Sequence, residues 1–474
     1  MMTLLALIAL LTTLTICESR YQLVVQVADR GDLPLLRKFM SQNDFDMEKI
    51  SMKHTVDDET FMHFANSMNG PSKSLEQLSR YINLDLSPYD PKSNNNDQQE
   101  QEKLQNQLLQ LPFVTAAYLK SLPEDPSIVK DFAHDRDANQ TPLFVENQEY
   151  LNGPGGFNVK AIHDLPGGKG ENVKVIDVER GWTFDHEDLK ESEGKVVHGT
   201  PVSYDDFHHG TAVTGIISGN ENDFGITGIA PKSKILGSCY TEEKEKTFPN
   251  VPLSILAAAK AVDPGDIMLI EIQASGPESK VIAMEYWPDN FHALKVATES
   301  GVIVFEAAGN GDADFDSPVY SRGEKGFPED WKNPFNRSLA DSGAILVGAG
   351  SPGNSTQRLY FSNYGSAVDV QGWGDDVASI GYGDLYHGEG ALYERNRYYT
   401  ATFSGTSSAT PCVSGCIAAL QSWVKTGAVS GKKLLTPADV RSLLRRTGRA
   451  QEDPEKRIGN RPDMVQLIKA LRSK

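Results

Sequence analysis

Three short blocks of the sequence carry an Asp, a His and a Ser that together could perform nucleophilic catalysis. Asp177 ends the apolar run 173–176, His209 opens the block His-Gly-Thr-Ala-Val-Thr-Gly, and Ser407 stands in Phe-Ser-Gly-Thr-Ser-Ser-Ala-Thr-Pro. A serine hydroxyl is a weak nucleophile at neutral pH, so it needs an imidazole to take its proton and a carboxylate to orient that imidazole. The three residues therefore predict acyl transfer through a serine nucleophile.

Each of these blocks also has a purely structural interpretation. A Ser after Gly-Thr can cap a helix, an Asp after a strand can lie in a solvated loop, and a His before Gly-Thr can be a turn residue. Among the histidines, His209 is favoured over His198, whose Gly-Thr runs into a proline rather than an apolar helix. His209 is also favoured over His208, because Gly directly follows His209. The order and combination of the blocks favour the catalytic interpretation.

In combination the blocks resemble the motifs of the subtilisin-like serine proteases, the subtilases, over roughly residues 140–470. The run 301–311 is similar to the subtilase strand whose Asn donates a hydrogen bond to the oxyanion, and the resemblance gives this role to Asn310 together with the backbone N–H of Ser407. It implies a secreted serine endopeptidase that hydrolyses peptide bonds through an acyl-enzyme. The alternative is a catalytically inert subtilase-like binding or scaffolding protein.

The resemblance also implies a substrate groove and a calcium site. The segment 271–277 is similar to the strand that pairs with extended substrate, although it has Ala and Ser where the family usually has Leu and Gly. The segments 185–189 and 220–226 match the calcium-site segments, and oxygen ligands suit that hard cation, with ordinary loop polarity as the alternative. The chemistry itself requires no cofactor. The expected substrate-binding residues are Gln273, Ala274, Ser275 and Gly276, and the expected calcium ligands are Asp188, Asn220, Asn222, Phe224 and Ile226.

The sequence departs from the family directly after Asp177. Subtilases commonly place Gly two residues after the catalytic Asp, but here Val-Glu-Arg precede Gly181. Glu179 thereby joins Glu271 and Glu306 as carboxylates on segments that lead to the site. One interpretation is that they are solvated or ion-paired separately. The other is that at least two lie close enough to share a proton, which would raise the pKa of one of them.

Four regions are expected along the 474 residues. Residues 1–19 are apolar but too short to span a bilayer comfortably, which is typical of a secretory signal. Residues 20–120 have mixed strand-like and helical spacing, and by position they resemble the subtilase propeptide, a small α+β inhibitor and folding template. Residues 121–141 are a linker with the maturation site. In 142–474 strands alternate with helices, which predicts a three-layer α/β domain with a largely parallel sheet and helices on both faces.

The spacing of apolar residues places the individual elements. In the first region we expect strands at 21–27 and 112–119, helices at 33–40 and 74–82, and a polar mobile loop at 93–100; in the last region we expect strands at 173–178, 234–239, 267–272, 302–305 and 344–348 and helices at 253–261, 292–298 and 435–444. Active sites of such sheets lie at the carboxyl ends of the strands.

Composition limits the partners. The net charge is −18, and no basic cluster is interleaved with aromatic residues, so we do not expect nucleic acid as a partner. After loss of the signal no run of 18 apolar residues remains, so we expect no membrane association. The expected product is a secreted monomer whose partners are protein or peptide substrates and its own propeptide. Loss of Cys17 would leave three cysteines, which excludes a disulfide scaffold, and Cys412 and Cys416 are interpreted as buried packing residues.

Overall fold

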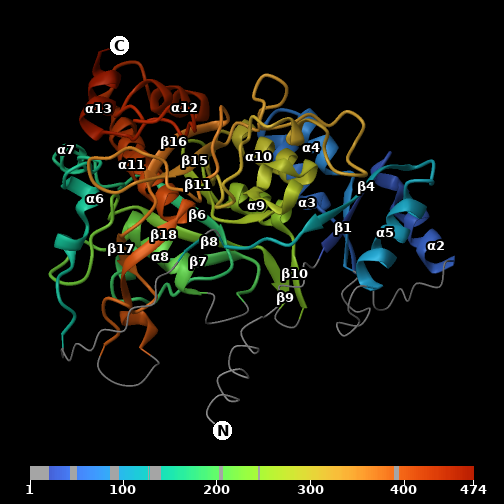
Figure 1. The fold of residues 1–474 in the computed structure, drawn as a ribbon, viewed down its shortest axis with the longest axis horizontal. Helices are drawn as coiled ribbons and strands as arrows, with labels where there is room; N and C mark the ends of the chain where they lie inside the picture. The colour runs from blue at the N-terminus through green and yellow to red at the C-terminus, as the bar shows by residue number, and fades with distance from the viewer. Residues whose placement is uncertain are drawn as a thin grey trace, which may run out of the picture.

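The computed structural model describes residues 21–42, 51–85, 96–125, 127–128, 140–201, 207–243, 246–388 and 394–473. The expected signal segment, residues 1–19, lies outside the described residues. Two main sheets organise the chain, one with four strands in the first region and one with seven strands in the last (Figure 1). No helix within the described ranges is both long and apolar enough to cross a bilayer.

The large sheet is parallel throughout, in the order β16-β15-β14-β11-β6-β8-β7. Its strands are β6 (Lys174–Glu179), β7 (Lys195–His198), β8 (Lys234–Cys239), β11 (Ile267–Ile270), β14 (Ile303–Ala307), β15 (Ile345–Gly350) and β16 (Val368–Trp373). The five inner strands are almost continuously buried, as expected for a parallel sheet covered on both faces. The predicted largely parallel sheet is confirmed.

Helices cover both faces of this sheet. On one face lie α8 (Phe207–Ser218), α11 (Thr406–Trp423), α12 (Pro437–Arg446) and α13 (Met464–Arg472), and on the other lie α9 (Val251–Ala261) and α10 (Pro288–Glu299). Alternate strand residues divide between the two cores, since Val175 and Leu269 pack with α8 and α11 whereas Ile176 and Met268 pack with α9 and α10. This alternation fixes the direction of the polar residues that follow in the same strands.

The first region forms a separate antiparallel sheet in the order β2-β3-β1-β4. Its elements are β1 (Tyr21–Val27), α2 (Leu33–Gln42), β2 (Ser51–His54), α3 (Asp58–Ser67), α4 (Lys73–Leu78), β3 (Tyr81–Asp85), α5 (Asn96–Leu108) and β4 (Val114–Ser121). Val24, Phe64 and Tyr118 from this unit belong to the same apolar cluster as residues of α9 and α10. The small unit therefore rests on that face of the large domain, where Figure 1 shows it beside α9 and α10.

Most predicted elements are confirmed within a few residues, and two predictions are wrong. The predicted helix 74–82 ends at Leu78, because Tyr81 and Ile82 are buried in β3, which pairs with β1. The polar stretch predicted as a loop is helical from Asn96, and α5 is anchored by the buried side chains of Leu104 and Leu108 further along it. The closing helix 435–444 corresponds to α12, after which α13 follows.

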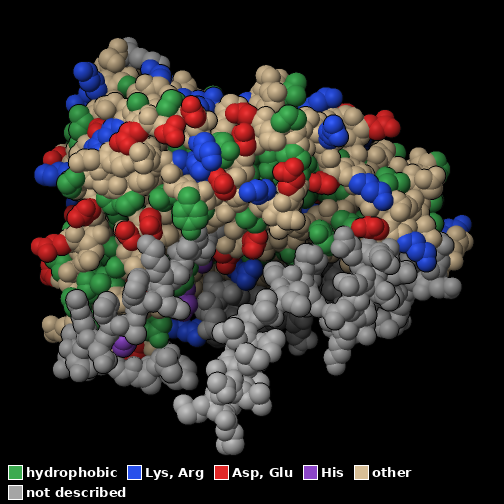
Figure 2. Space-filling model, viewed as in Figure 1, with side chains coloured by type: hydrophobic (Ala, Val, Ile, Leu, Met, Phe, Trp, Pro, Cys, Tyr) green, Lys and Arg blue, Asp and Glu red, His purple; other side chains and the backbone are tan. Residues whose placement is uncertain are grey.

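Cysteine and charge placement also follow the sequence. Cys239, Cys412 and Cys416 are buried and unpaired, which confirms the packing interpretation of the last two. On the face drawn in Figure 2, acidic and basic side chains are interspersed rather than separated into patches.

Candidate active site

The candidate site lies where β6 and β14 end and where α8 and α11 begin. Asp177 and Glu179 stand two residues apart near the end of β6, His209 is in the first turn of α8, and Ser407 is in the first turn of α11. All four side chains are buried. The His209 ring contacts Glu179 of β6 and Phe403 of the strand that leads into α11, so these three elements meet at the carboxyl edge of the sheet.

The carboxylate in contact with the imidazole is Glu179 and not the predicted Asp177. His209 Nδ1 forms a short hydrogen bond with Glu179 Oε2. Asp177 Oδ2 instead accepts a hydrogen bond of 2.8 Å from Trp182 Nε1. Side chains two residues apart on a strand share one face, so both carboxylates point toward α8, and Glu179 stands two residues nearer the carboxyl end of β6. Our assignment of Asp177 as the orienting carboxylate is corrected by these contacts.

A sequence signal for Glu179 was present and was misread. The family spacing places Gly two residues after the triad carboxylate, and Gly181 stands two residues after Glu179. There is no two-residue insertion after the triad carboxylate if that carboxylate is Glu179, which lies two residues further along the strand than Asp177. The strand register alone could not reveal this, because Asp177 and Glu179 face the same way.

Close packing holds the imidazole in place. Glu179 Oε1 accepts a hydrogen bond of 3.0 Å from the backbone N–H of Arg180. The His209 ring contacts Phe403 edge to face, with centroids 5.6 Å apart. A Cβ on Gly210 would lie 2.7 Å from Trp182 Nε1 and 2.8 Å from Glu179 Cγ, so only glycine fits beside the His–Glu pair.

Burial dominates the electrostatics of the covered site. It raises the pKa of Glu179 well above its usual range and lowers the pKa of His209. It also raises the pKa of Asp177 to about 7, an effect that the Trp182 hydrogen bond partly offsets. His209 Nε2, the atom that would accept the serine proton, is buried without a hydrogen-bond partner among the described residues. The covered site thus disfavours a charge-separated His–Glu pair.

The side-chain amide of Asn310 is fixed next to the first turn of α11. Its Oδ1 accepts hydrogen bonds of 3.0 Å from both the backbone N–H and the hydroxyl of Thr406. Thr406 Oγ1 in turn accepts from the backbone N–H of Gly309 at 3.2 Å. Gly405, just before the helix, has φ of 110°, a conformation that favours glycine. With Oδ1 engaged as an acceptor, Nδ2 is the donor group of the Asn310 side chain.

A segment of the chain itself lies along the site. Glu124 pairs with Gln273 through two backbone hydrogen bonds of 2.8 Å, and β5 (Ser127–Ile128) pairs with the last two residues of β18 (Tyr399–Gly405). The parts of this segment on either side of residue 126, which lies outside the described residues, therefore pair with the two strands that flank the site. Gln273 Oε1 also accepts from the backbone N–H of Asn310 at 2.8 Å.

The other predicted groove residues continue the strand that begins at Gln273. Ala274 and Ser275 pair with β13 (Val281–Ala283), and the N–H of Gly276 donates to Lys280 at 2.8 Å. Gln273 thus pairs with the covering segment, while Ala274, Ser275 and Gly276 form the hairpin β12–β13 that supports it.

Comparison with known proteins identifies the family. A model of the subtilase family matches residues 92–460. The chain belongs to the subtilase family. The intracellular serine protease of Paenibacillus polymyxa is 27% identical over 295 residues, which cover 59% of this subtilase and 75% of the relative. Alkaline elastase YaB of Bacillus sp. (strain YaB) is 30% identical over 269 residues, which cover 56% of this chain and 59% of the elastase.

A solved structure shows the same fold. The crystal structure of fervidolysin from Fervidobacterium pennivorans, described as a keratinolytic enzyme related to subtilisin, matches with a TM-score of 0.58 at 17% identity. The match covers 96% of this subtilase, which spans 61% of the fervidolysin chain. The subtilase fold is therefore shown, and the chain is a member of a family of serine endopeptidases.

The expected calcium ligands of this subtilase are arranged as a hydrogen-bonded loop. Asp188 accepts hydrogen bonds of 2.8 Å from Asn222 Nδ2 and from the N–H of Ile226, while Asn222 Oδ1 accepts from the N–H of Phe224 at 3.0 Å. Asn220 Oδ1 is buried without a partner among the described residues. N–H donors therefore occupy both oxygens of Asp188 and the side-chain oxygen of Asn222, whereas Asn220 Oδ1 has no such donor. The calcium site stays a prediction.

A second group of side chains has the spacing of a metal site. Ligand atoms of Asp125, Glu179 and His209 all lie within 4.8 Å of one another. The imidazole in this group is already hydrogen-bonded to Glu179, so we interpret the group as acid–base machinery covered by a carboxylate of the chain itself. Asp125 is the contribution of the covering segment.

Of the three extra carboxylates, two interact. Glu271 is fully buried, and the charges of Asp177 and Glu179 act on it. Glu306 lies elsewhere, where its Oε1 accepts a hydrogen bond of 2.9 Å from the N–H of Glu285. The electrostatic coupling of Glu179 with Glu271 matches the interpretation that at least two carboxylates lie close together, and Glu306 does not belong to that pair.

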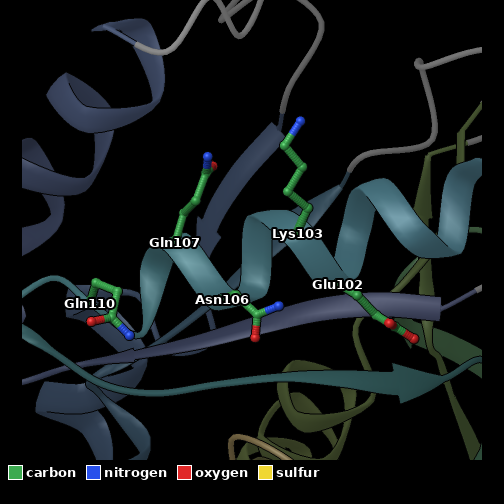
Figure 3. Close-up of a pocket in the computed structure, with 5 residues that line it drawn as sticks. All are labelled: Glu102, Lys103, Asn106, Gln107 and Gln110. Atoms are coloured by element: carbon green, nitrogen blue, oxygen red, sulfur yellow. The ribbon is translucent and has the colours of Figure 1, made fainter.

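A surface pocket elsewhere does not contribute to this site. It is lined by five polar residues of α5 and the turn after it, Glu102, Lys103, Asn106, Gln107 and Gln110 (Figure 3). None of the predicted site residues lies there. The catalytic interpretation therefore rests on the covered site at the edge of the large sheet.

Proposed function

We propose that this subtilase is a secreted serine endopeptidase with a Glu179–His209–Ser407 triad. The observation that carries the proposal is the hydrogen bond between His209 Nδ1 and Glu179. Ser407 attacks the scissile carbonyl while His209 Nε2 takes its proton and later returns it to the leaving amine. Glu179 holds the tautomer with the proton on Nδ1 and stabilises the imidazolium as it forms. Water then hydrolyses the acyl-enzyme by the same proton transfers in reverse.

Two donors would stabilise the tetrahedral intermediate. We propose that Asn310 Nδ2 and the backbone N–H of Ser407 donate hydrogen bonds to the oxyanion that develops when Ser407 attacks a carbonyl. Preorganised donors of this kind do not need to reorient during the reaction. In subtilisin, a member of this family, removing one such donor lowers kcat by about 10²–10³-fold.

The first unit, residues 20–120, is proposed to be an inhibitory propeptide. Its strand β4 carries Lys120, which forms a buried ion pair with Asp289 at the start of α10, and Tyr118 donates to the same carboxylate at 2.8 Å. Glu124 follows three residues after β4 and pairs with the proposed substrate strand at Gln273. The unit is thus connected directly to the segment that covers the site.

Maturation would cut this covering segment. Glu124 pairs on one side of the site and Ile128 on the other, and Ser407 follows the strand paired with Ile128 by two residues. We propose that the first bond hydrolysed lies between Asp125 and Ile128, within the predicted linker 121–141. Edman or mass-spectrometric analysis of the processed protein should find its new N-terminus there. A first new N-terminus outside residues 126–128 contradicts this assignment, and one before residue 110 or beyond residue 165 also contradicts the predicted linker.

Labelling with a fluorophosphonate tests the function directly. The processed enzyme should be labelled at Ser407 and should degrade denatured casein, and Ser407→Ala should abolish both. The inert binding protein remains the second candidate, and absence of labelling in processed, folded protein would favour it over the protease.

A further inference from the structure

Three carboxyl groups lie on one face of two neighbouring strands. β6 and β11 are parallel, with Leu269 opposite Asp177 and Ile270 opposite Val178. Asp177 and Glu179 alternate with residues of the α9 and α10 face, so both point toward α8 and α11. Glu271 continues β11 on the same side, and its N–H donates to the carbonyl of Val178 at 3.4 Å. The three carboxyls therefore share one buried compartment.

Two of these carboxyl groups have oxygens that nothing satisfies. Neither oxygen of Glu271 has a hydrogen-bond partner among the described residues, and neither does Asp177 Oδ1. Both residues are buried, with 0% and 1% of the residue exposed. An ionised carboxylate taken out of water without a partner costs several kcal/mol. Three separate anions in this compartment are therefore untenable.

Two of the four titratable groups that face the pair are carboxyls. The titratable groups that face them are Glu179 on β6, His209 on α8, Cys412 on α11 and Asp125 of the covering segment. The charges that act on Glu271 are those of Asp177, Glu179 and Asp125, all acidic. Burial raises the pKa of Glu271 well above its usual range, and that of Asp177 to about 7. A proton within the group is the remaining way to limit its charge.

We propose that Asp177 and Glu271 hold one proton between them at neutral pH, which keeps Glu179 the single anionic partner of His209 in the working enzyme. One of the two carboxyl groups stays protonated while the other is ionised, so the pair carries one negative charge and no other bond changes. Glu271 is then a positioning residue, since it acts on the imidazole through Asp177 and Glu179. The inference rests on the proposed role of Glu179.

Carboxyl protonation can be measured without catalysis. We would use the full chain with Ser407→Ala, which prevents self-cleavage, and Asp125→Asn, which removes the carboxyl of the covering segment. With ¹³C-labelled Asp and Glu carboxyls, a protonated signal at neutral pH should disappear on Glu271→Gln. In that variant Asp177 is ionised, so the site keeps one negative charge at these two positions. Glu306→Gln is the matched control and should remove a different signal.

Two spectroscopic outcomes would overturn the proposal. If no protonated carboxyl is lost on Glu271→Gln, Glu271 is ionised at neutral pH. If the signal instead disappears on Glu179→Gln and survives Glu271→Gln, the proton resides on the triad carboxyl. Neither result depends on activity, so failure here is distinguishable from failure of the proposed triad.

The pH dependence of kcat/KM gives a second readout of the charge on the pair. Because the pair and its Glu271→Gln form both carry one negative charge, the acid limb of kcat/KM should stay in place. If Asp177 and Glu271 were both ionised, the substitution would remove a nearby negative charge and move the acid limb down by about 1 pH unit. Such a shift overturns the proposal.

Discussion

Replacing Glu179 and Asp177 of β6 by amides, one at a time, shows which of the two carboxylates orients His209. Glu179→Gln removes the anionic acceptor of His209 Nδ1 and can present an amide N–H there, which favours the wrong tautomer. Loss of the orienting carboxylate in serine-protease triads costs about 10⁴ in kcat. That factor corresponds to about 5.5 kcal/mol of transition-state stabilisation. We therefore expect Glu179→Gln to slow peptide hydrolysis by about 10⁴-fold.

Asp177→Asn is the matched variant. Asn keeps an oxygen that can accept the 2.8 Å hydrogen bond from Trp182 Nε1, and it loses only the charge. Replacing a charge-assisted hydrogen bond with a neutral one costs about 1 kcal/mol, which predicts a loss of less than about tenfold. Each variant replaces one carboxylate of β6 with the corresponding amide, so their general effects on folding are comparable.

Self-cleavage of the full chain is the most direct assay. The rate constant for appearance of the new N-terminus after refolding reports the first turnover, and it requires no exogenous substrate. Circular dichroism and the melting temperature show whether each variant has folded. A loss of about 10⁴-fold in Asp177→Asn with little change in Glu179→Gln would refute the reasoning and restore the Asp177 triad.

Further predictions follow from particular contacts. Gly210→Ala should destabilise the protein by about 1–3 kcal/mol in urea titrations and reduce activity, because its Cβ would overlap Trp182; unchanged stability would contradict the packing. Lys120→Met should lower the free energy of unfolding of the full chain by about 3–5 kcal/mol, since it leaves the Asp289 carboxylate buried without its cation, whereas Lys38→Met, at an exposed position, should not. Chelation by EDTA should leave the melting temperature unchanged, and a fall would support a bound cation. Glu271 has a raised folded-state pKa, so its effect on stability is unfavourable and grows as pH rises above the unfolded value; Glu271→Gln should therefore raise the melting temperature more at alkaline than at acid pH.

The sequence predicted those site residues whose surroundings are local. Ser407 and His209 each open an apolar helix, so the motif carries both the residue and the element that positions it. Asn310 follows a buried strand in the same way. The orienting carboxylate is different, because two acidic residues with identical strand direction compete for one imidazole. Only the relative position of β6 and α8 decides that competition in favour of Glu179.

The fold shows the same division between local and distant causes. The parallel sheet could be predicted because apolar strands alternate with helices along the chain. The predicted helix 74–82 included the first two residues of β3, Tyr81 and Ile82, because they fit a helical spacing, and the pairing of β3 with β1, far away in sequence, overrides that spacing. The covering segment was predicted only as a linker, since its backbone partners at Gln273 and β18 lie far along the sequence.

Having the covering segment and Ser407 on one polypeptide has a kinetic consequence. The first bond offered to the nucleophile belongs to the same molecule, so activation would follow first-order kinetics and would proceed equally fast in a dilute secretion and in a concentrated one. Each newly made molecule would then become active without meeting another copy, and the time to activation would be counted from the folding of that chain.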